Sequence, residues 1–270
     1  MTRLALGVSY DGSPWHGWQS QPHGQTVQDH FQRAVHQFTG ESARVVCSGR
    51  TDAGVHALEQ VVHLDTSVDR SLESWTRALN SMLPSSISVT WVKPVSDDFH
   101  ARFSATARTY IYIVRNDRIR SPLVHRRVGW MYYPLSLSLM KEAAVRLSGK
   151  HDFSSFRASE CQAASPVRDL QQIDIEQHGV YYIFTFKANA FLHHMVRNLM
   201  GTLIYAGLGR MSPDAVTTLL HQKDRCFAPP TFSADGLYFA RVDYPASFNL
   251  PQLSAQENFK LHFGFLCEKS

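Results

Sequence analysis

The stretch Gly49–Ala57 places an arginine, an aspartate and a histidine in one loop that contains two glycines, in the order Gly-Arg-Thr-Asp-Ala-Gly-Val-His-Ala. It connects two short apolar runs, Val45–Ser48 and Gln60–Leu64, whose composition is typical of β-strands. Adjacent antiparallel strands need only about two to five connecting residues, so this loop is longer than a turn requires. Glycine permits positive φ or close backbone approach. We therefore expect the loop to hold the Asp52 carboxylate in a defined direction, beside the cation of Arg50.

A carboxylate positioned in this way can act as a nucleophile or as a general base. The plainer alternative is an Asx-turn, in which Asp52 accepts hydrogen bonds from its own downstream amides. The length of the loop, its glycines and the arginine two residues earlier favour the positioned carboxylate over the simple turn.

The elements around this loop follow the order βαββαβ, which is typical of a ferredoxin-like unit. Thr26 is predicted to cap a helix, with Asp29 in the capping-box position and Gly40 at the end. The predicted strands are Leu4–Tyr10, Val45–Ser48, Gln60–Leu64 and Ile87–Val92, and the second helix is Leu72–Met82.

The second half of the chain repeats this order of elements without a repeat of residues. The predicted strands are 109–114, 170–176, 181–186 and 237–242, and the predicted helices are 139–147, 191–208 and a short extra one at 214–221. We therefore predict an α+β fold of two ferredoxin-like halves. Residues 1–105 would form the domain that carries the Asp52 loop, and residues 106–270 a second domain with extra helices. Their antiparallel or mixed sheets would lie side by side, with an active-site cleft between them.

Composition indicates a globular protein without a membrane span. The chain has 270 residues, of which 44% are hydrophobic and 19% charged, so disorder is not expected. No run approaches the roughly 18–20 apolar residues of a transmembrane helix. The four cysteines are widely separated and predict free thiols rather than a disulfide framework or zinc site. Met1–Leu4 leads into a strand without a signal-peptide core, so we expect a cytoplasmic protein. The net charge of +4 permits contact with phosphates.

Five ordered motifs resemble those of the TruA-type tRNA pseudouridine synthases. They are Tyr10–Gly12 with Gly17–Gln19, Arg50–Ala57, Asp98–Ala105 with Arg108–Tyr110, Lys187–Asn198, and Gly236–Tyr238. The resemblance implies an isomerase that converts uridine to pseudouridine at positions 38, 39 and 40 of the tRNA anticodon stem and loop. It also implies a homodimer in which one tRNA touches both subunits.

The resemblance also implies roles for individual residues, and it makes Asp52 the catalytic residue. Tyr110 would stack on the flipped base or help to remove the C5 proton, and ordinary packing of a strand aromatic is the alternative. Arg50 would pair with Asp52 or fill the gap left in the RNA stack. Arg197 would pair with Asp52. The alternative for Arg50 is a solvated position in the loop. The alternative for Arg197 is a structural ion pair elsewhere.

Two further binding residues are expected, and Lys187 is chosen because it ends a strand just before the long apolar helix. Lys187 would contact a phosphate, and Leu237 would wall the uracil pocket, unless it is an ordinary core leucine. The reaction is redox-neutral, so no cofactor is expected. Adjacent His193 and His194 do not share one helix face, so no metal is expected either.

Three alternatives to this function remain open at the level of sequence. One is an RNA-binding module without catalysis, because ferredoxin-like sheets bind single strands through stacked aromatics. Another is a metal-dependent hydrolase that uses some of the 14 histidines. The third keeps the chemistry but changes the RNA target. The chemical route is open as well, since a carboxylate can attack C1′, attack C6, or remove the 2′ proton to give a glycal.

Overall fold

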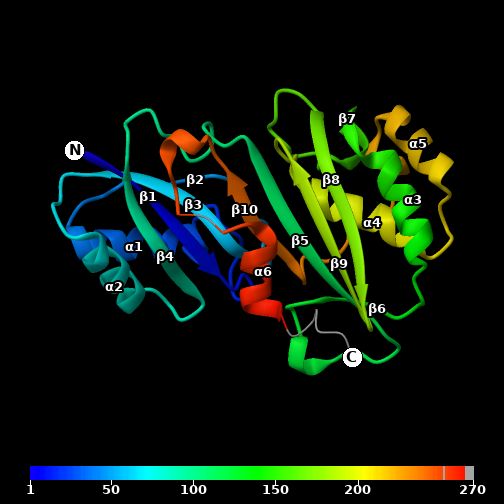
Figure 1. Ribbon diagram of the computed structural model, residues 1–270, viewed down its shortest axis with the longest axis horizontal. Helices are drawn as coiled ribbons and strands as arrows, with labels where there is room; N and C mark the ends of the chain where they lie inside the picture. Colours follow the sequence, from blue (N-terminus) through cyan, green and yellow to red (C-terminus); the bar gives the residue numbers. More distant parts are fainter. Residues whose placement is uncertain (252, 265–270) are drawn as a thin grey trace. The chain divides into compact units, whose positions relative to one another are not determined.

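The computed structural model describes residues 1–251 and 253–264 (Figure 1). The chain forms two compact units. The first contains residues 1–106 and 238–262, and the second contains residues 107–237 with the described residues 263 and 264. Helices and strands occur in both units, so the predicted α+β class is confirmed.

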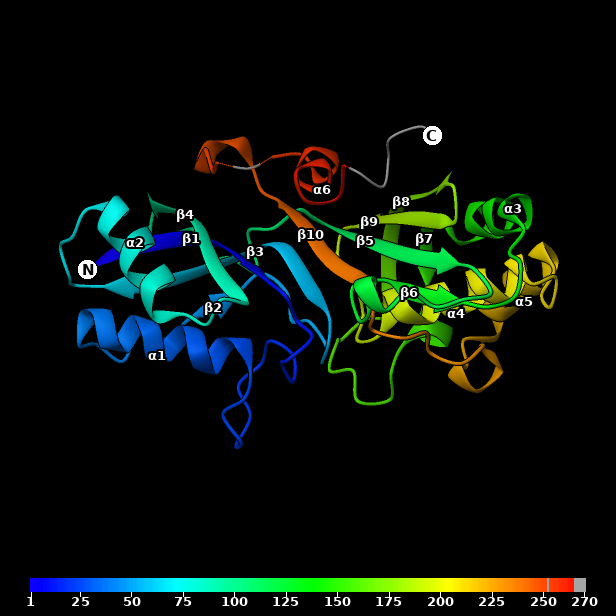
Figure 2. The ribbon, with the colours of Figure 1, turned by 90° about the horizontal axis from the view of Figure 1, so that it is seen from below.

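The first unit has the predicted βαββαβ order. Its elements are β1 (Thr2–Tyr10), α1 (Val27–Thr39), β2 (Val46–Cys47), β3 (His56–Thr66), α2 (Leu72–Met82) and β4 (Ile87–Val95). Strand β1 pairs antiparallel with β3 and β4, so that Leu6 lies opposite Val62 on one side and Val92 on the other. The short strand β2 pairs with β3, and so does β10 (Leu237–Asp243), which runs parallel to it. Helix α1 lies on one face of these strands (Figure 2).

Local sequence signals set the limits of α1. The Thr26 hydroxyl accepts from the Asp29 amide while the Asp29 carboxylate accepts from the Thr26 amide, which is the predicted capping box. Gly40 ends the helix in the left-handed conformation at φ 76°. Between these ends the helix buries one apolar face against the sheet. The fully buried side chains of the first unit include Leu6, Val8, Phe31, Val35, Val61, Leu64 and Leu79.

One carboxyl group in this core is buried, and burial has the largest effect on its pKa. Glu59 on β3 is 4% exposed, and its Oε1 accepts a hydrogen bond from the Trp91 indole at 3.1 Å. Burial raises the pKa of Glu59 to about 7. The unfolded chain would lose this proton near pH 4.5 and the folded chain only near pH 7, so the free energy of unfolding falls as pH rises through that window.

We therefore expect Glu59→Gln to stabilise the protein at pH 8 by up to about 3 kcal/mol, because the amide carries no charge to bury. The same variant should change stability little at pH 4.5, where the wild-type carboxyl is already protonated in the fold. Urea unfolding at the two pH values measures both differences. An equal change at both would show that the charge of Glu59 is not the cause.

The second unit contains the remaining elements. They are β5 (Ala107–Asn116), β6 (Gly129–Met131), α3 (Leu137–Leu147), β7 (Gly149–Asp152), β8 (Val167–His178), β9 (Tyr181–Ala188), α4 (Met195–Gly207) and α5 (Pro213–Gln222). The strand order is β5-β9-β8-β7, all antiparallel, and β6 pairs in parallel with β5. Helix α3 packs against α4, α5 and β8. A tight turn joins β8 and β9, with Gly179 at φ 57°.

Several elements differ from the sequence prediction. Strands β6 and β7 and the C-terminal helix α6 (Ala255–Phe263) were not predicted. Helix α4 begins at Met195 and not at Phe191, because His194 before it adopts the left-handed conformation at φ 60°. A single left-handed residue cannot belong to a right-handed helix, so the chain from 191 to 194 forms an irregular approach instead.

The described cysteines and helices match the compositional expectations. Cys47, Cys161 and Cys226 are free thiols, and Cys267 lies outside the described residues. Within residues 1–251 and 253–264, no helix has the length and apolar character that crossing a bilayer would need.

Candidate active site

Asp52 lies in the loop between β2 and β3, at the first position of a four-residue turn. The Val55 amide donates to the Asp52 carbonyl at 3.1 Å, and Gly54 takes the left-handed conformation at φ 80°. Thr51 before it is buried, Asp52 is half-buried, and Arg50 is exposed. The loop therefore has a fixed backbone and leaves its carboxylate partly accessible, with a cationic side chain two residues away.

The N-terminal motif holds this loop from one side. The Trp18 amide donates to the Thr51 carbonyl at 3.1 Å, and the Gly54 amide donates to the Trp15 carbonyl at 3.3 Å. The Tyr10 hydroxyl lies 2.8 Å from the Thr51 hydroxyl, in a buried hydrogen bond. Hydrogen bonds therefore hold the loop on both sides of Asp52. The segment from Tyr10 to Trp18 makes these bonds, which explains why the N-terminal motif and the aspartate motif occur in the same chain.

Two glycines of that motif are needed because the loop backbone lies against them. A Cβ added at Gly12 would lie 2.0 Å from the Val55 carbonyl oxygen. A Cβ added at Gly17 would lie 2.7 Å from the Thr51 carbonyl oxygen and 3.1 Å from the Asp52 carbonyl carbon. Gly17 also has φ 86°, a region that side chains disfavour. Both positions therefore exclude any larger residue unless the Asp52 loop moves.

The opposite flank of the loop is held from β3. The Ser48 hydroxyl donates to Gln60 Oε1 at 2.5 Å, and the Gln60 amide nitrogen donates to the Gly49 carbonyl at 2.6 Å. Gln60 is fully buried. No role was predicted for Gln60, although a polar residue inside an apolar strand indicates a buried polar contact of this kind.

His56, at the end of the motif, also serves to position the loop. Its ring stacks on Tyr238 with centroids 4.6 Å apart, and its Nδ1 lies 3.1 Å from both the Gly12 amide and Asp11 Oδ1. Nδ1 accepts from the amide when unprotonated and donates to Asp11 when protonated, so the two bonds alternate. The His56 contact holds the pKa of Asp11 well below its usual range. Asp11 also accepts hydrogen bonds from the Ser13 amide and hydroxyl, so it is held as an anion next to His56.

The other predicted site residues lie in the second unit. Tyr110 on β5 is opposite Phe186 on β9, and Lys187 is opposite the neighbouring Thr109. The Tyr110 side chain is 9% exposed, and its ring meets that of Phe191 edge-on at 5.0 Å. Packing against the Phe191 ring restricts the orientation of the tyrosine ring.

Arg197 is the third residue of α4 and holds the segment that precedes β10. Its Nε donates to the Phe232 carbonyl at 3.0 Å, and the Phe232 amide donates to the Arg197 carbonyl at 3.1 Å. On the next turn a Cβ added at Gly201 would lie 2.2 Å from the Pro230 carbonyl oxygen. The helix and this segment are therefore packed backbone to backbone.

Leu237 follows the same segment and is 3% exposed, and its amide donates to the Ala234 carbonyl at 3.1 Å. Gly236 before it has φ 88°, and a Cβ there would lie 2.4 Å from the Ile113 carbonyl oxygen. The turn into Leu237 therefore requires glycine, which explains the Gly236–Tyr238 motif. Asp52 and Arg50 thus belong to the first unit, and Tyr110, Lys187, Arg197 and Leu237 to the second.

Comparison with known proteins identifies the family. The family described as tRNA pseudouridine synthase matches residues 7–104 and 143–245. This chain belongs to the tRNA pseudouridine synthase family. The tRNA pseudouridine synthase A of Bordetella avium (strain 197N) is 56% identical over 255 residues, which cover 94% of this chain and 96% of that protein. The enzyme of the same name from Paraburkholderia xenovorans (strain LB400) is 53% identical, and the match covers 93% of each chain.

Membership of the tRNA pseudouridine synthase family confirms the resemblance seen in the sequence, and with it an isomerase that acts on tRNA. Neither the non-catalytic RNA-binding module nor the metal-dependent hydrolase receives support from these relatives. Asp52 lies within the first matched range, whereas Tyr110 falls between the two matched ranges.

Proposed function

We propose that this tRNA pseudouridine synthase isomerises uridines 38, 39 and 40 of the tRNA anticodon stem and loop, with Asp52 as its catalytic residue. The observation that carries the proposal is the anchoring of the Asp52 loop, which holds a partly accessible carboxylate by backbone bonds on both sides. The reaction breaks the N1–C1′ bond, turns the uracil, and joins C1′ to C5. A preorganised carboxylate serves the first step whether it attacks C1′, attacks C6, or takes the 2′ proton.

The remaining residues are proposed as the substrate-binding set. A uridine inside a stem is not accessible to a side chain, so the nucleotide must leave the stack. Exposed Arg50 fills the gap or keeps Asp52 ionised, and the Tyr110 ring stacks on the flipped uracil. The Tyr110 hydroxyl assists removal of the C5 proton in the last step. In this proposal residues 1–105 are the domain that carries the catalytic loop, and residues 106–270 the domain that carries Tyr110.

Arg197, Lys187 and Leu237 complete the proposed set. Half-buried Lys187 lies at the end of β9, where an ammonium group can contact a phosphate. Buried Leu237 supplies an apolar wall for the uracil ring. Arg197 pairs with the Asp52 carboxylate in this proposal, and its bond to the Phe232 carbonyl orients the guanidinium. The chemistry is redox-neutral and requires no electron-carrying cofactor.

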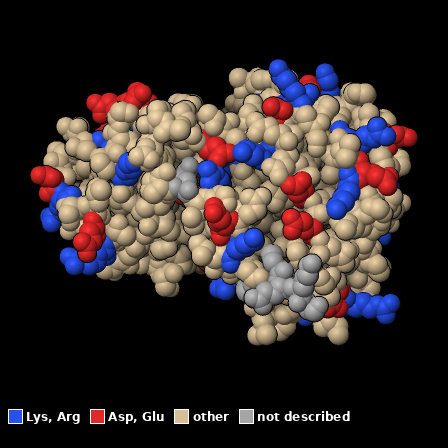
Figure 3. All heavy atoms as spheres, in the orientation of Figure 1, with Lys and Arg blue, Asp and Glu red and all other residues tan. Residues whose placement is uncertain are grey.

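We also propose that the enzyme works as a cytoplasmic homodimer. The net charge of one chain is only +4, and the face shown in Figure 3 carries acidic and basic residues interspersed over both units. Two such chains together would offer a more extended positive surface to one RNA than a single chain does.

Mapping of pseudouridine in tRNA from cells that lack this protein tests the proposed positions. We expect pseudouridine at 38, 39 and 40 to disappear, and to return when the wild-type gene is supplied. Pseudouridine at other tRNA positions is the internal control, because other enzymes make it. Unchanged levels at all three positions would refute the proposed target, and losses elsewhere in RNA would identify a different one.

A further inference from the structure

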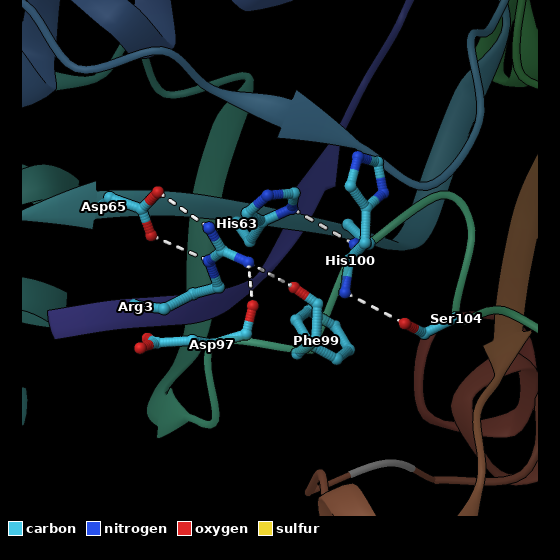
Figure 4. A network of polar contacts seen from close by, with 8 residues as sticks. Arg3, His63, Asp65, Asp97, Phe99, His100 and Ser104 are labelled. Carbon is cyan, nitrogen blue, oxygen red and sulfur yellow. Dashed lines mark hydrogen bonds and ion pairs between the residues drawn. The ribbon is translucent and has the colours of Figure 1, made fainter.

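The motif Asp98–Ala105 forms a rigid turn in the first unit that the proposed reaction does not use. The Arg3 guanidinium anchors its beginning, since it bonds the Asp65 carboxylate at 2.7 and 2.8 Å and donates to the Phe99 carbonyl at 3.0 Å (Figure 4). It also donates to the Asp97 carbonyl. The Phe99 ring is fully buried beside Tyr244, with centroids 5.1 Å apart.

The middle of the turn is held from both sides through the backbone of Ala101. Its amide donates to His63 Nδ1 at 3.1 Å, and its carbonyl accepts from the Tyr244 hydroxyl at 2.6 Å. Burial lowers the pKa of His63 to about 4, so the ring is neutral at physiological pH and its Nδ1 accepts this bond.

The end of the turn closes around His100. The His100 amide donates to the Ser104 hydroxyl at 2.9 Å, as Figure 4 shows, and the Ser104 amide donates back to the His100 carbonyl. The amides of Arg102 and Phe103 both lie 3.2 Å from His100 Nδ1. Every part of the turn is therefore fixed by hydrogen bonds.

This turn presents an aromatic ring to solvent. The Phe103 side chain is 76% exposed, although the Phe99 ring four residues earlier is completely buried. One face of Phe103 stacks on the His100 ring at 4.3 Å and 30°, and the Arg102 guanidinium lies 5.7 Å from the ring centroid. A ring supported in this way has little conformational freedom to lose when a flat ligand stacks on it.

Arginines of the first unit act electrostatically on groups at the turn and next to the Asp52 loop. Burial lowers the pKa of His100, and the cations of Arg3, Arg102 and Arg44 lower it further. Burial raises the pKa of the Cys47 thiol to about 11, and Arg50 and Arg102 both oppose that rise. Arg50 of the catalytic loop and Arg102 of the turn thus act on the same side chain, within one unit.

We propose that Phe103, supported by His100, is a stacking platform for an unpaired base of the tRNA, and that Arg102 binds the adjacent phosphate. The inference rests on the proposed function, and it adds a second contact with the RNA beside the reacting uridine. Aromatic rings with neighbouring cations are how proteins bind unpaired bases without reading their sequence. A carbohydrate or an apolar peptide would not require the arginines that accompany the ring.

The test compares Phe103→Ala and Phe103→Tyr, with Phe227→Ala as the matched control. Phe227 is also an exposed phenylalanine, at 62%, and lies in the second unit. We expect Phe103→Ala to weaken equilibrium binding of unmodified tRNA by about 5- to 150-fold at fixed salt. Phe103→Tyr, which keeps the ring, and Phe227→Ala should bind like wild type. KM should rise with the dissociation constant while kcat changes little.

Two further measurements, of oligomeric state and of pseudouridine formation, distinguish the possible explanations for weaker tRNA binding. Sedimentation of each variant without RNA should show the wild-type oligomeric state. A change of oligomeric state that occurs only in Phe103→Ala would show that this surface is an interface between two copies of the chain, and would overturn the proposal. Unchanged tRNA affinity in Phe103→Ala would also overturn it. If the wild-type enzyme binds tRNA through Phe103 but forms no pseudouridine at positions 38 to 40, the proposed function fails and the stacking platform stands.

Discussion

Replacement of Asp52 by asparagine should lower the rate of pseudouridine formation by about 10⁴-fold or more, because the amide has neither the negative charge nor the basicity of the carboxylate. The side chain keeps its size, and the loop is held by backbone bonds of Thr51, Asp52 and Gly54, so the fold should remain intact. Binding of tRNA should change by less than about tenfold, since the lost group acts on the reacting atoms. Joining C1′ to C5 releases the C5 proton, so release of tritium from tRNA labelled at uridine C5 measures the reaction.

The matched control is Asp69→Asn, which makes the same chemical change at an exposed carboxylate of the first unit. That variant should form pseudouridine at the wild-type rate. Retention of activity in Asp52→Asn would remove this residue from the chemistry. A loss of tRNA binding as large as the loss of rate would assign Asp52 to tRNA binding and not to the chemical step.

The second large effect is expected for Gly17→Ala, which tests whether the N-terminal motif positions the catalytic loop. The added methyl would lie 2.7 Å from the Thr51 carbonyl oxygen and 3.1 Å from the Asp52 carbonyl carbon, both backbone atoms. Relief of this overlap requires the loop to move, and a displacement near 1 Å can lower kcat by about 10²-fold. Strain at φ 86° and overpacking should together reduce the free energy of unfolding by about 2–4 kcal/mol.

Gly24→Ala separates displacement of the loop from backbone strain. Gly24 also has positive φ, at 68°, but beyond its two chain neighbours no atom of the described residues lies within 4 Å of an added Cβ. It should therefore lose only about 1–2 kcal/mol of stability and keep its kcat. Single-turnover rates with saturating enzyme, together with urea unfolding of both variants, make the comparison. Equal kcat values for the two variants would show that Gly17 does not position the Asp52 loop.

Local signals made much of the first unit predictable. The capping box of Thr26 and Asp29, the left-handed Gly40, and the alternation of strand residues are properties of a few consecutive amino acids. They operate before any tertiary contact exists, so the βαββαβ order follows from pattern alone. Local pattern does not predict the start of α4. His194 adopts the left-handed conformation, so the helix begins at Met195. Helical periodicity continues through that position, and no local pattern marks the break.

Of the candidate site, the sequence by itself determined the carboxylate, its neighbouring arginine and the family to which both belong, since these depend on residue identity and spacing. Only the tertiary structure decided what holds the Asp52 loop. Gly12 and Gly17 contact its backbone from a segment distant in the chain, and the Gln60 side chain donates to the Gly49 carbonyl. It also decided that Phe99 is buried while Phe103 faces solvent. The burial of a ring depends on which other segments of the chain pack against it. The sequence of a motif with two phenylalanines does not show which of the two rings is covered.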